Sequence, residues 1–189
     1  MKTISMVDLE TTGLDAQQHE IIELGIVVFE AEAPFTIIDT LNLKIKPEHP
    51  ETGSAAAYRV NGYTEEAWKD AVTLKEAITR IWDVNGISKS NFCSYNVTFD
   101  WSFMQEAYKK LGEREPFHHL KLDMFSLAWG RIPQGNLNRW NLKSVCEYLG
   151  VPPEPEVHRA LNGAMAAYNS YARLMGEGFV VTEQTMLSL

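Results

Sequence analysis

Cysteine and long apolar runs are both scarce in this sequence. Its only two cysteines, Cys93 and Cys146, have no CxxC partner, so we interpret them as reduced core thiols rather than as a disulfide or zinc site. No apolar run approaches the roughly 20 residues that cross a bilayer, and the first residues lack the basic-then-apolar order of a signal peptide. We therefore expect a cytoplasmic protein without a membrane partner.

Basic residues are also few relative to acidic ones. The chain has 17 lysines and arginines against 25 acidic residues, for a formal net charge of −8. This balance disfavours a protein that coats nucleic acid with a broad basic face, whereas binding of one phosphate or one strand end is compatible with it. A length of 189 residues with 45% hydrophobic content predicts a single domain over residues 1–189, with a core spanning about 3–175.

The spacing of apolar residues changes from the strand period to the helix period along the chain. Three strands are expected first, joined by short connections as an antiparallel meander, and helices then alternate with short strands. This order predicts an α/β protein in which helices flank a mixed central sheet. The expected strands are 3–9, 20–31, 36–47, 91–97 and 122–123, and the expected helices are 64–71, 73–84, 100–112, about 124–132, 141–151 and 158–175.

Three acids are expected to converge at one edge of this sheet. Asp8 and Glu10 lie two residues apart in the first strand, and therefore on one face of it. With their Cα atoms roughly 6.6 Å apart, the two carboxylates would repel by about 2.5 kcal/mol at an effective dielectric of about 20. A positive partner is therefore expected between them. Solvated edge strands also carry such pairs, but the apolar neighbours favour burial here. Asp100 opens the helix that follows another strand. Oxygen ligands of this kind suit Mg²⁺ or Mn²⁺.

Three short segments carry a resemblance to a known family. "VDLETTGL" near the start, "NVTFD" about ninety residues later and "HRAL" at the start of a late helix occur in the order of the DEDDh 3′-to-5′ exonucleases, which include ribonuclease T and the epsilon subunit of DNA polymerase III. "YRVNGYT" is also similar, although Asn61 stands where a histidine is common. The resemblance covers residues 3 to about 175 and implies a three-layer ribonuclease H-like fold.

The resemblance also implies a reaction. Asp8, Glu10 and Asp100 would hold two divalent ions, Mg²⁺ or Mn²⁺, and His158 would be the general base that takes a proton from the attacking water. The product would be a nucleoside 5′-monophosphate. As the first residue of a helix, His158 would also feel the positive end of the helix dipole, which favours a neutral imidazole. Without the motif, a histidine at a helix start is usually a surface or capping residue.

A second set of residues is implied to contact the terminal nucleotide. In the family the turn after the acids meets the 3′-hydroxyl and packs an apolar side chain on the base. The alternative is a strand-ending turn whose glycine is needed only for backbone freedom, and an Asn or Phe near a helix start also serves turns and cores. The implied substrate-binding residues are Thr11, Thr12, Gly13, Leu14, Asn96 and Phe99.

One element of the family pattern is missing. The pattern has a fourth acid five residues after the histidine, and this chain has Gly163 there, preceded by Asn162, with no further acid until Glu177. Asn162 or a water could fill the position, but a neutral oxygen offsets less of the ion's charge. Because loss of even a supporting partner typically lowers metal affinity or activity 10- to 100-fold, reduced activity is expected.

The sequence therefore predicts a metal-dependent exonuclease that acts on 3′ ends of single-stranded DNA or RNA. The alternative is a catalytically inactive module with the same fold that binds nucleic acid or a protein partner. Retention of the acids and of His158 favours catalysis, because an abandoned site has no physical reason to keep repelling acids together. The expected partners are a nucleic-acid 3′ end, the monophosphate product, and either a second copy of the chain or a polymerase or repair protein.

Overall fold

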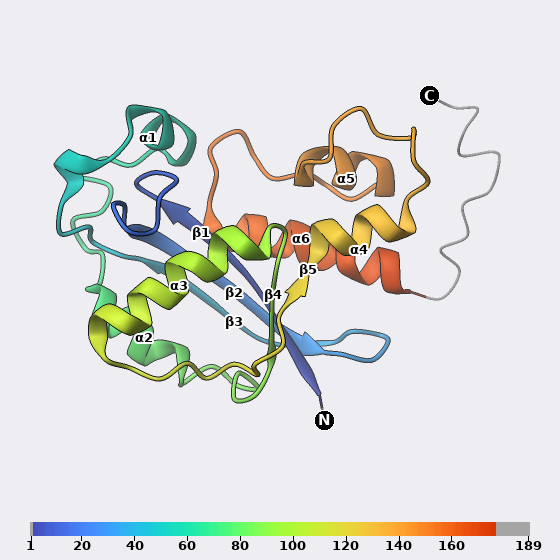
Figure 1. The fold of residues 1–189 in the computed structure, drawn as a ribbon, viewed down its shortest axis with the longest axis horizontal. Helices are drawn as coiled ribbons and strands as arrows, with labels where there is room; N and C mark the ends of the chain where they lie inside the picture. Colours follow the sequence, from blue (N-terminus) through green and yellow to red (C-terminus); the bar gives the residue numbers. More distant parts are fainter. Residues whose placement is uncertain (1, 177–189) are drawn as a thin grey trace.

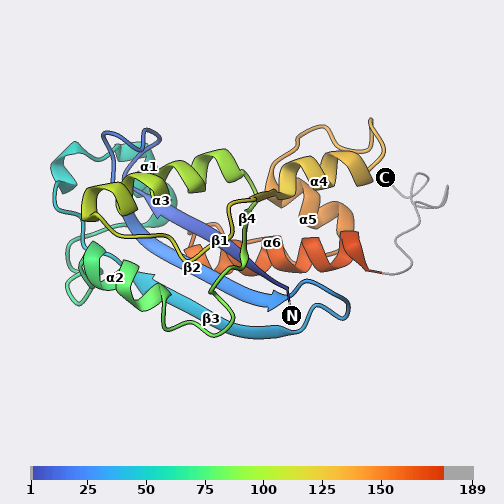
Figure 2. The same ribbon diagram turned by 60° about the horizontal axis from the view of Figure 1, so that its bottom comes forward.

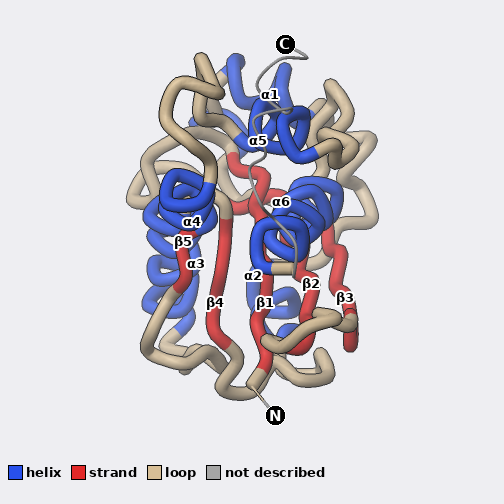
Figure 3. The backbone as a smooth tube through the Cα atoms, turned by 90° about the vertical axis from the view of Figure 1, so that its right-hand side faces the viewer, coloured by secondary structure: helices blue, strands red, loops and turns tan. Residues whose placement is uncertain are grey.

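The computed structural model describes residues 2–176, so Glu177 lies outside the described residues. A five-stranded sheet forms its centre, with strand order β3-β2-β1-β4-β5 (Figure 1). β1 runs antiparallel to β2 and β2 to β3, whereas β4 is parallel to β1 and β5 to β4. The mixed sheet with an antiparallel meander is thus confirmed, and Figure 3 shows the strands side by side. The strands are β1 (Thr3–Thr11), β2 (Ile21–Glu30), β3 (Ile37–Lys44), β4 (Asn91–Ser94) and β5 (Leu122–Asp123).

Helices cover both faces of this sheet. One apolar core joins the sheet to α2 and α3, and a second joins the opposite face to α4, α5 and α6. Figure 2 shows α2 and α3 toward the left and α4 and α5 toward the right, with α6 running from the middle to the right. The three-layer architecture is therefore confirmed. The helices are a 3-10 turn (Pro50–Thr52), α1 (Ala55–Asn61), α2 (Leu74–Ile81), α3 (Val97–Leu111), α4 (Met124–Arg131), α5 (Leu142–Leu149) and α6 (Ala160–Met175). None of those within residues 2–176 has both the length and the apolar character that a membrane crossing requires.

Strand β1 divides its side chains between the two cores. Val7 and Leu9 pack against α2 and α3, whereas Met6 packs in the core beside α6. Because side chains alternate along a strand, Asp8 and Glu10 continue the series of Met6 and lie on the α6 face. The start of α6 reaches this face closely, since a Cβ on Gly25, which pairs with Asp8, would lie 2.2 Å from the carbonyl carbon of Ala160.

The helix expected at 64–71 is absent, and α1 stands earlier in the chain instead. Residues 65–70 form turns, in which the buried Trp68 donates a hydrogen bond from Nε1 to the carbonyl of Ile22 at 2.7 Å. A helix of two turns is marginal on its own, so this tertiary anchor decides the local conformation. The earlier helix, α1, is capped by the Ser54 hydroxyl and ends at Gly62.

The positions of His158 and Asp100 relative to their helices differ from those predicted from the sequence. His158 was expected to open the last helix, but α6 begins at Ala160 with Arg159 as its N-cap. His158 therefore lies before the helix, whereas the helix dipole acts within the first helical turn. The expectation that the dipole favours a neutral His158 is wrong for this reason. Asp100 does not open α3 either. It is the fourth residue of a helix that begins at Val97.

The two cysteines are as the sequence predicts. Cys93 and Cys146 are both free and buried.

Candidate active site

The three predicted acids lie near enough to one another, around the end of β1, for their charges to interact. Glu10 is 7% exposed and Asp100 is 4% exposed, while Asp8 is half-buried. Burial raises the pKa of Glu10 to about 8, and the nearby charges of Glu154 and Glu23 add to the effect. The pKa of Asp8 is raised well above its ordinary value by burial and then by Asp100 and Glu10. Burial also raises the pKa of Asp100 to about 7. The site thus disfavours its own negative charge and suits a cation.

A fourth buried acid on the same face was not predicted. Glu23 lies opposite Glu10 in the antiparallel register of β1 and β2 and is 1% exposed. Burial raises its pKa, which the charges of Arg159 and Lys44 oppose. Among residues 2–176, no hydrogen-bond partner reaches its Oε2. The sequence feature that could have identified Glu23 is its position as a single charged residue inside the apolar run "IIELGIVV".

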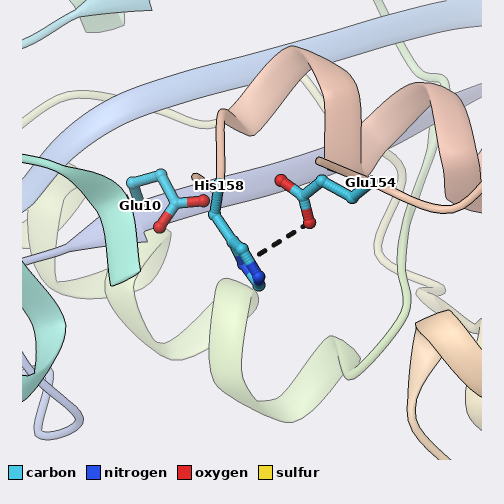
Figure 4. A group of neighbouring side chains, drawn as sticks. All are labelled: Glu10, Glu154 and His158. Atoms are coloured by element: carbon cyan, nitrogen blue, oxygen red, sulfur yellow. Dashed lines mark ion pairs between the residues drawn. The ribbon is translucent and has the colours of Figure 1, made fainter. Parts of the chain in front are cut away.

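His158 lies beside two carboxylates. The imidazole and the carboxylates of Glu10 and Glu154 each place one ligand atom within 4.8 Å of the other two (Figure 4). Nδ1 of His158 is 3.4 Å from Oε2 of Glu154, and the two side chains are 46% and 13% exposed. Glu154 was not predicted as a site residue. Its signal in the sequence was an acid within the segment "VPPEPEV", four residues before the histidine.

Gly163 faces one of the acids, Asp8. It is buried in α6, and a Cβ added there would lie 2.4 Å from Oδ2 of Asp8 and 2.8 Å from its Cγ. The carboxylate of Asp8 therefore occupies the space in which a side chain at residue 163 would begin.

The turn after β1 is held by hydrogen bonds. The Thr12 hydroxyl accepts from the backbone N–H of Glu20 at 2.9 Å, and the Thr11 hydroxyl donates to the carbonyl of Gly13 at 2.7 Å. A Cβ on Gly13 would lie 2.2 Å from the ring of His19, so only glycine fits there without a shift. These contacts give Thr11, Thr12 and Gly13 structural roles, whereas Leu14 is 86% exposed and free to contact a ligand.

The structure gives different surroundings to Asn61, Asn96 and Phe99. The buried Asn61 donates from Nδ2 to the carbonyl of Thr11 at 3.0 Å, which ties α1 to the turn. Asn96 is exposed at the N-cap of α3, and its side chain makes no capping hydrogen bond. Phe99 is half-buried, with its ring centroid 5.0 Å from that of Phe103. Asn96 is thus available to a ligand, and Phe99 serves at least the core.

The raised pKa values predict a stability that falls as pH rises. Glu10 has an ordinary pKa of 4.5 and a folded-state pKa of about 8, so the folded chain holds more protons than the unfolded chain between these values. Stability is then greatest below the unfolded pKa and is lost as pH rises through the folded one. Asp100, with its pKa raised to about 7, acts in the same direction. In EDTA, we expect a melting temperature at about pH 8.5 lower by about 5 °C or more than at about pH 5.

Thermal melts over this pH range check the expectation, and Glu10→Gln supplies the comparison. That variant removes the titrating group, so its melting temperature should decline less with pH. A melting temperature of the parent chain that rises between about pH 5 and about pH 8.5 would contradict the assignment of buried, mutually repelling acids.

Comparison with known proteins places this chain in a family. A family model described as exonuclease, of the ribonuclease T type, matches residues 5–171. The DNA polymerase III PolC-type of Thermotoga maritima is 28% identical over 176 residues, which are 92% of this chain and 12% of that protein. The chain therefore spans about a tenth of the length of that relative.

Solved structures with the same fold include two exonucleases. The nuclease domain of 3′hExo, a DEDDh family member bound to rAMP, has a TM-score of 0.73 at 19% identity, covering 94% of this chain and 93% of that one. E. coli exonuclease I in complex with a dT13 oligonucleotide has a TM-score of 0.74 at 16% identity, covering 91% of this chain and 40% of that one.

The sequence motifs, the three-layer fold and the family match over residues 5–171 agree, and the chain belongs to the exonuclease family that its DEDDh-type motifs predicted.

Proposed function

We propose that this chain is a metal-dependent 3′-to-5′ exonuclease that releases nucleoside 5′-monophosphates from single-stranded nucleic acid. The observation that carries the proposal is the convergence of Asp8, Glu10 and Asp100, whose pKa values are all raised, at one strand end. Buried carboxylates that repel one another are stabilised when a cation binds between them. An arrangement of this kind without a ligand would only destabilise the fold.

The donor set fits divalent metal ions. Asp8, Glu10 and Asp100 offer carboxylate oxygens, which Mg²⁺ and Mn²⁺ prefer, and the half-buried Asp8 leaves the site open to a phosphate group. When bound, a pair of such ions activates water and stabilises the charge that develops on the departing 3′-oxygen. Asp8, Glu10 and Asp100 would hold these ions.

His158 and the turn after β1 supply the remaining roles. At 46% exposure, the His158 imidazole is accessible to a water molecule and can accept its proton as the phosphodiester is attacked. The exposed Leu14 can pack on the terminal base, and the backbone of Thr11 to Gly13 is held in place to meet the 3′-hydroxyl. Asn96 can position the same nucleotide.

The comparisons support both kinds of nucleic acid as substrates. One solved relative in fold is bound to rAMP and another to a dT13 oligonucleotide, so the proposal includes RNA and DNA ends. The PolC-type relative supports a DNA polymerase or repair protein as partner, and with it a cytoplasmic location.

Mononucleotide binding should depend on metal. We expect AMP or dTMP to bind with measurable heat in calorimetry when Mn²⁺ is present and much more weakly in EDTA, because bound ions attract the phosphate. Asp8→Ala should abolish this difference, whereas Asp70→Ala, which removes an exposed acid outside the site, should preserve it. Equal affinity with and without Mn²⁺ would remove the site from this strand end.

Digestion of a 5′-labelled oligonucleotide tests the activity itself. A ladder that shortens from the 3′ end in Mn²⁺ and not in EDTA is the expected result. Metal-dependent nucleotide binding without any digestion would instead favour the inactive binding module, for which the glycine at residue 163 is the supporting feature.

A further inference from the structure

No carboxylate occupies the place of the fourth acid of the family pattern in this chain, because residue 163 is a glycine. Gly163 faces Asp8, and the Asp8 carboxylate fills the space that a Cβ would take, at 2.4 Å from Oδ2. The neighbouring Asn162 is exposed and lines a surface hollow together with Pro152 and Pro153. A further negative charge at the site would therefore come from another element than α6.

Glu154 reaches the site from the segment between α5 and α6. Pro153 and Pro155 flank it, and a residue before a proline is restricted to extended backbone, so the segment is stiff. Its Oε1 accepts the backbone N–H of Arg159 at 2.9 Å, which fixes the carboxylate at the entry to α6. Its Oε2 lies toward His158. One oxygen thus anchors the side chain, and the other faces His158 at the site.

Glu10 points into the same space and lacks a partner. It is a charged side chain with only 7% of its surface exposed. Within residues 2–176 we find no hydrogen bond or ion pair to its carboxylate. Figure 4 shows this carboxylate beside His158, across from Glu154. Among the neighbouring charges, the acid Glu154 has the largest effect on the pKa of Glu10 and raises it, whereas Arg159 lowers it.

The spacing of these groups suits one metal ion. Ligand atoms of Glu10, Glu154 and His158 lie within 4.8 Å of one another. Around an ion with bonds of about 2.1 Å, opposite ligands are about 4.2 Å apart, so a small movement lets Glu10 and Glu154 bind one ion with the His158 imidazole beside it. The proline-flanked segment keeps Glu154 near this position before the ion binds, which lowers the entropy lost on binding.

We propose that Glu154 is a metal ligand that, with Glu10, supplies the negative charge that Gly163 does not. The inference rests on the proposed function, because it assigns a further residue to the same metal site. The added acidic ligand would thus come from the segment before α6 rather than from α6 itself.

Glu154→Gln tests this role through metal affinity. Glutamine keeps Oε1 as an acceptor for the Arg159 N–H but removes the charge, so the segment should retain its conformation. We expect Mn²⁺ to bind about tenfold more weakly or worse, as followed by calorimetry or by the electron paramagnetic resonance signal of free Mn²⁺. In EDTA the melting temperature should be unchanged or higher, because one repelling acid near Glu10 is gone.

Glu156→Gln is the matched control, since it makes the same charge change at an exposed residue two positions further along. It should leave Mn²⁺ affinity within about twofold of the parent. If Glu154→Gln binds Mn²⁺ as the parent does while Asp8→Ala does not bind, Glu154 is no ligand and the inference fails, although the proposed metal site stands. If the parent itself binds no Mn²⁺, both fail together.

A background substitution separates a ligand from a residue that only orients His158. In His158→Ala the imidazole is gone, so Glu154→Gln can no longer act through it. The expected result is again about tenfold weaker Mn²⁺ binding when Glu154→Gln is added to this background. No change in that background would overturn the assignment and leave Glu154 as a positioning residue for His158.

Discussion

His158→Ala is expected to slow the chemical step of digestion by about 10² or more while mononucleotide binding changes little, as loss of a general base should. The structure makes this substitution mild for the fold. The side chain is 46% exposed, and its one described ion pair is to Glu154. The backbone N–H of His158 donates to the carbonyl of Val60 at 3.1 Å, and alanine keeps that bond. A loss of rate would therefore report on chemistry.

Single-turnover digestion of a 5′-labelled oligonucleotide at saturating Mn²⁺ measures the step. His119→Ala is the control, because it removes an exposed imidazole far along the chain from the site residues. A His158→Ala variant that keeps its rate would demote His158 to a surface residue. A fall in Mn²⁺ affinity that matches the fall in rate would instead make the imidazole a metal ligand.

The strands and the helix α3 could be predicted because their signals are local. β2 was expected at 20–31 and runs over Ile21–Glu30, since its apolar run is bounded by polar residues on both sides. β3 was expected at 36–47 and runs over Ile37–Lys44, within an alternation of apolar and polar side chains that continues to Lys46. Helix α3 begins three residues earlier than its expected start at Asp100, which lies in its first turn.

Contacts between distant segments explain what the sequence missed. The region 64–71 has helix-forming composition, but Trp68 is anchored to β2 through a hydrogen bond to Ile22. Helix α6 begins after His158 and not at it, because Glu154, five residues before Arg159, accepts the backbone N–H of Arg159 at the start of the helix. No periodicity marks either contact, since both depend on where the chain returns in space.

Contacts between distant segments also explain why part of the candidate site could not be predicted. Asp8 and Glu10 stand out because acids in an apolar strand are conspicuous, and the motif order adds Asp100 and His158. Glu23 becomes significant only when β2 pairs with β1 and sets it opposite Glu10. Glu154 becomes significant only when its segment folds back over the strand end. The catalytic and substrate-binding roles of the motif residues stay predictions, which the variants above address.

Gly163→Asp is expected to raise the rate of 3′-to-5′ digestion by about 10- to 100-fold, because it restores an acid that faces Asp8 from α6. Without metal the variant should be no more stable than the parent. A fourth acid adds repulsion, and its Cβ would lie 2.4 Å from Oδ2 of Asp8, so that carboxylate must rotate away. The helix itself gains only modestly when aspartate replaces glycine. With Mn²⁺ the variant should be more stable, since an ion that binds the folded state adds stability.

Melting temperatures with and without Mn²⁺, measured beside digestion rates, test both halves of this expectation. Gly163→Asn is the matched control, because it introduces nearly the same volume against Asp8 without the charge. It should displace the Asp8 carboxylate equally but give neither the gain in rate nor the metal-dependent stabilisation. If Gly163→Asn matches Gly163→Asp in both, the effect comes from moving Asp8 and not from a new ligand.

Combining Gly163→Asp with Glu154→Gln shows whether the two acids serve one purpose. If Glu154 supplies the charge that Gly163 does not, Glu154→Gln should weaken Mn²⁺ binding about tenfold in the parent chain and by much less in the Gly163→Asp background, because the new acid on α6 takes over. Equal losses in the two backgrounds would mean that the acids act independently. Absence of any metal-dependent gain in Gly163→Asp would mean that residue 163, although it lies against Asp8, is not at a ligand position.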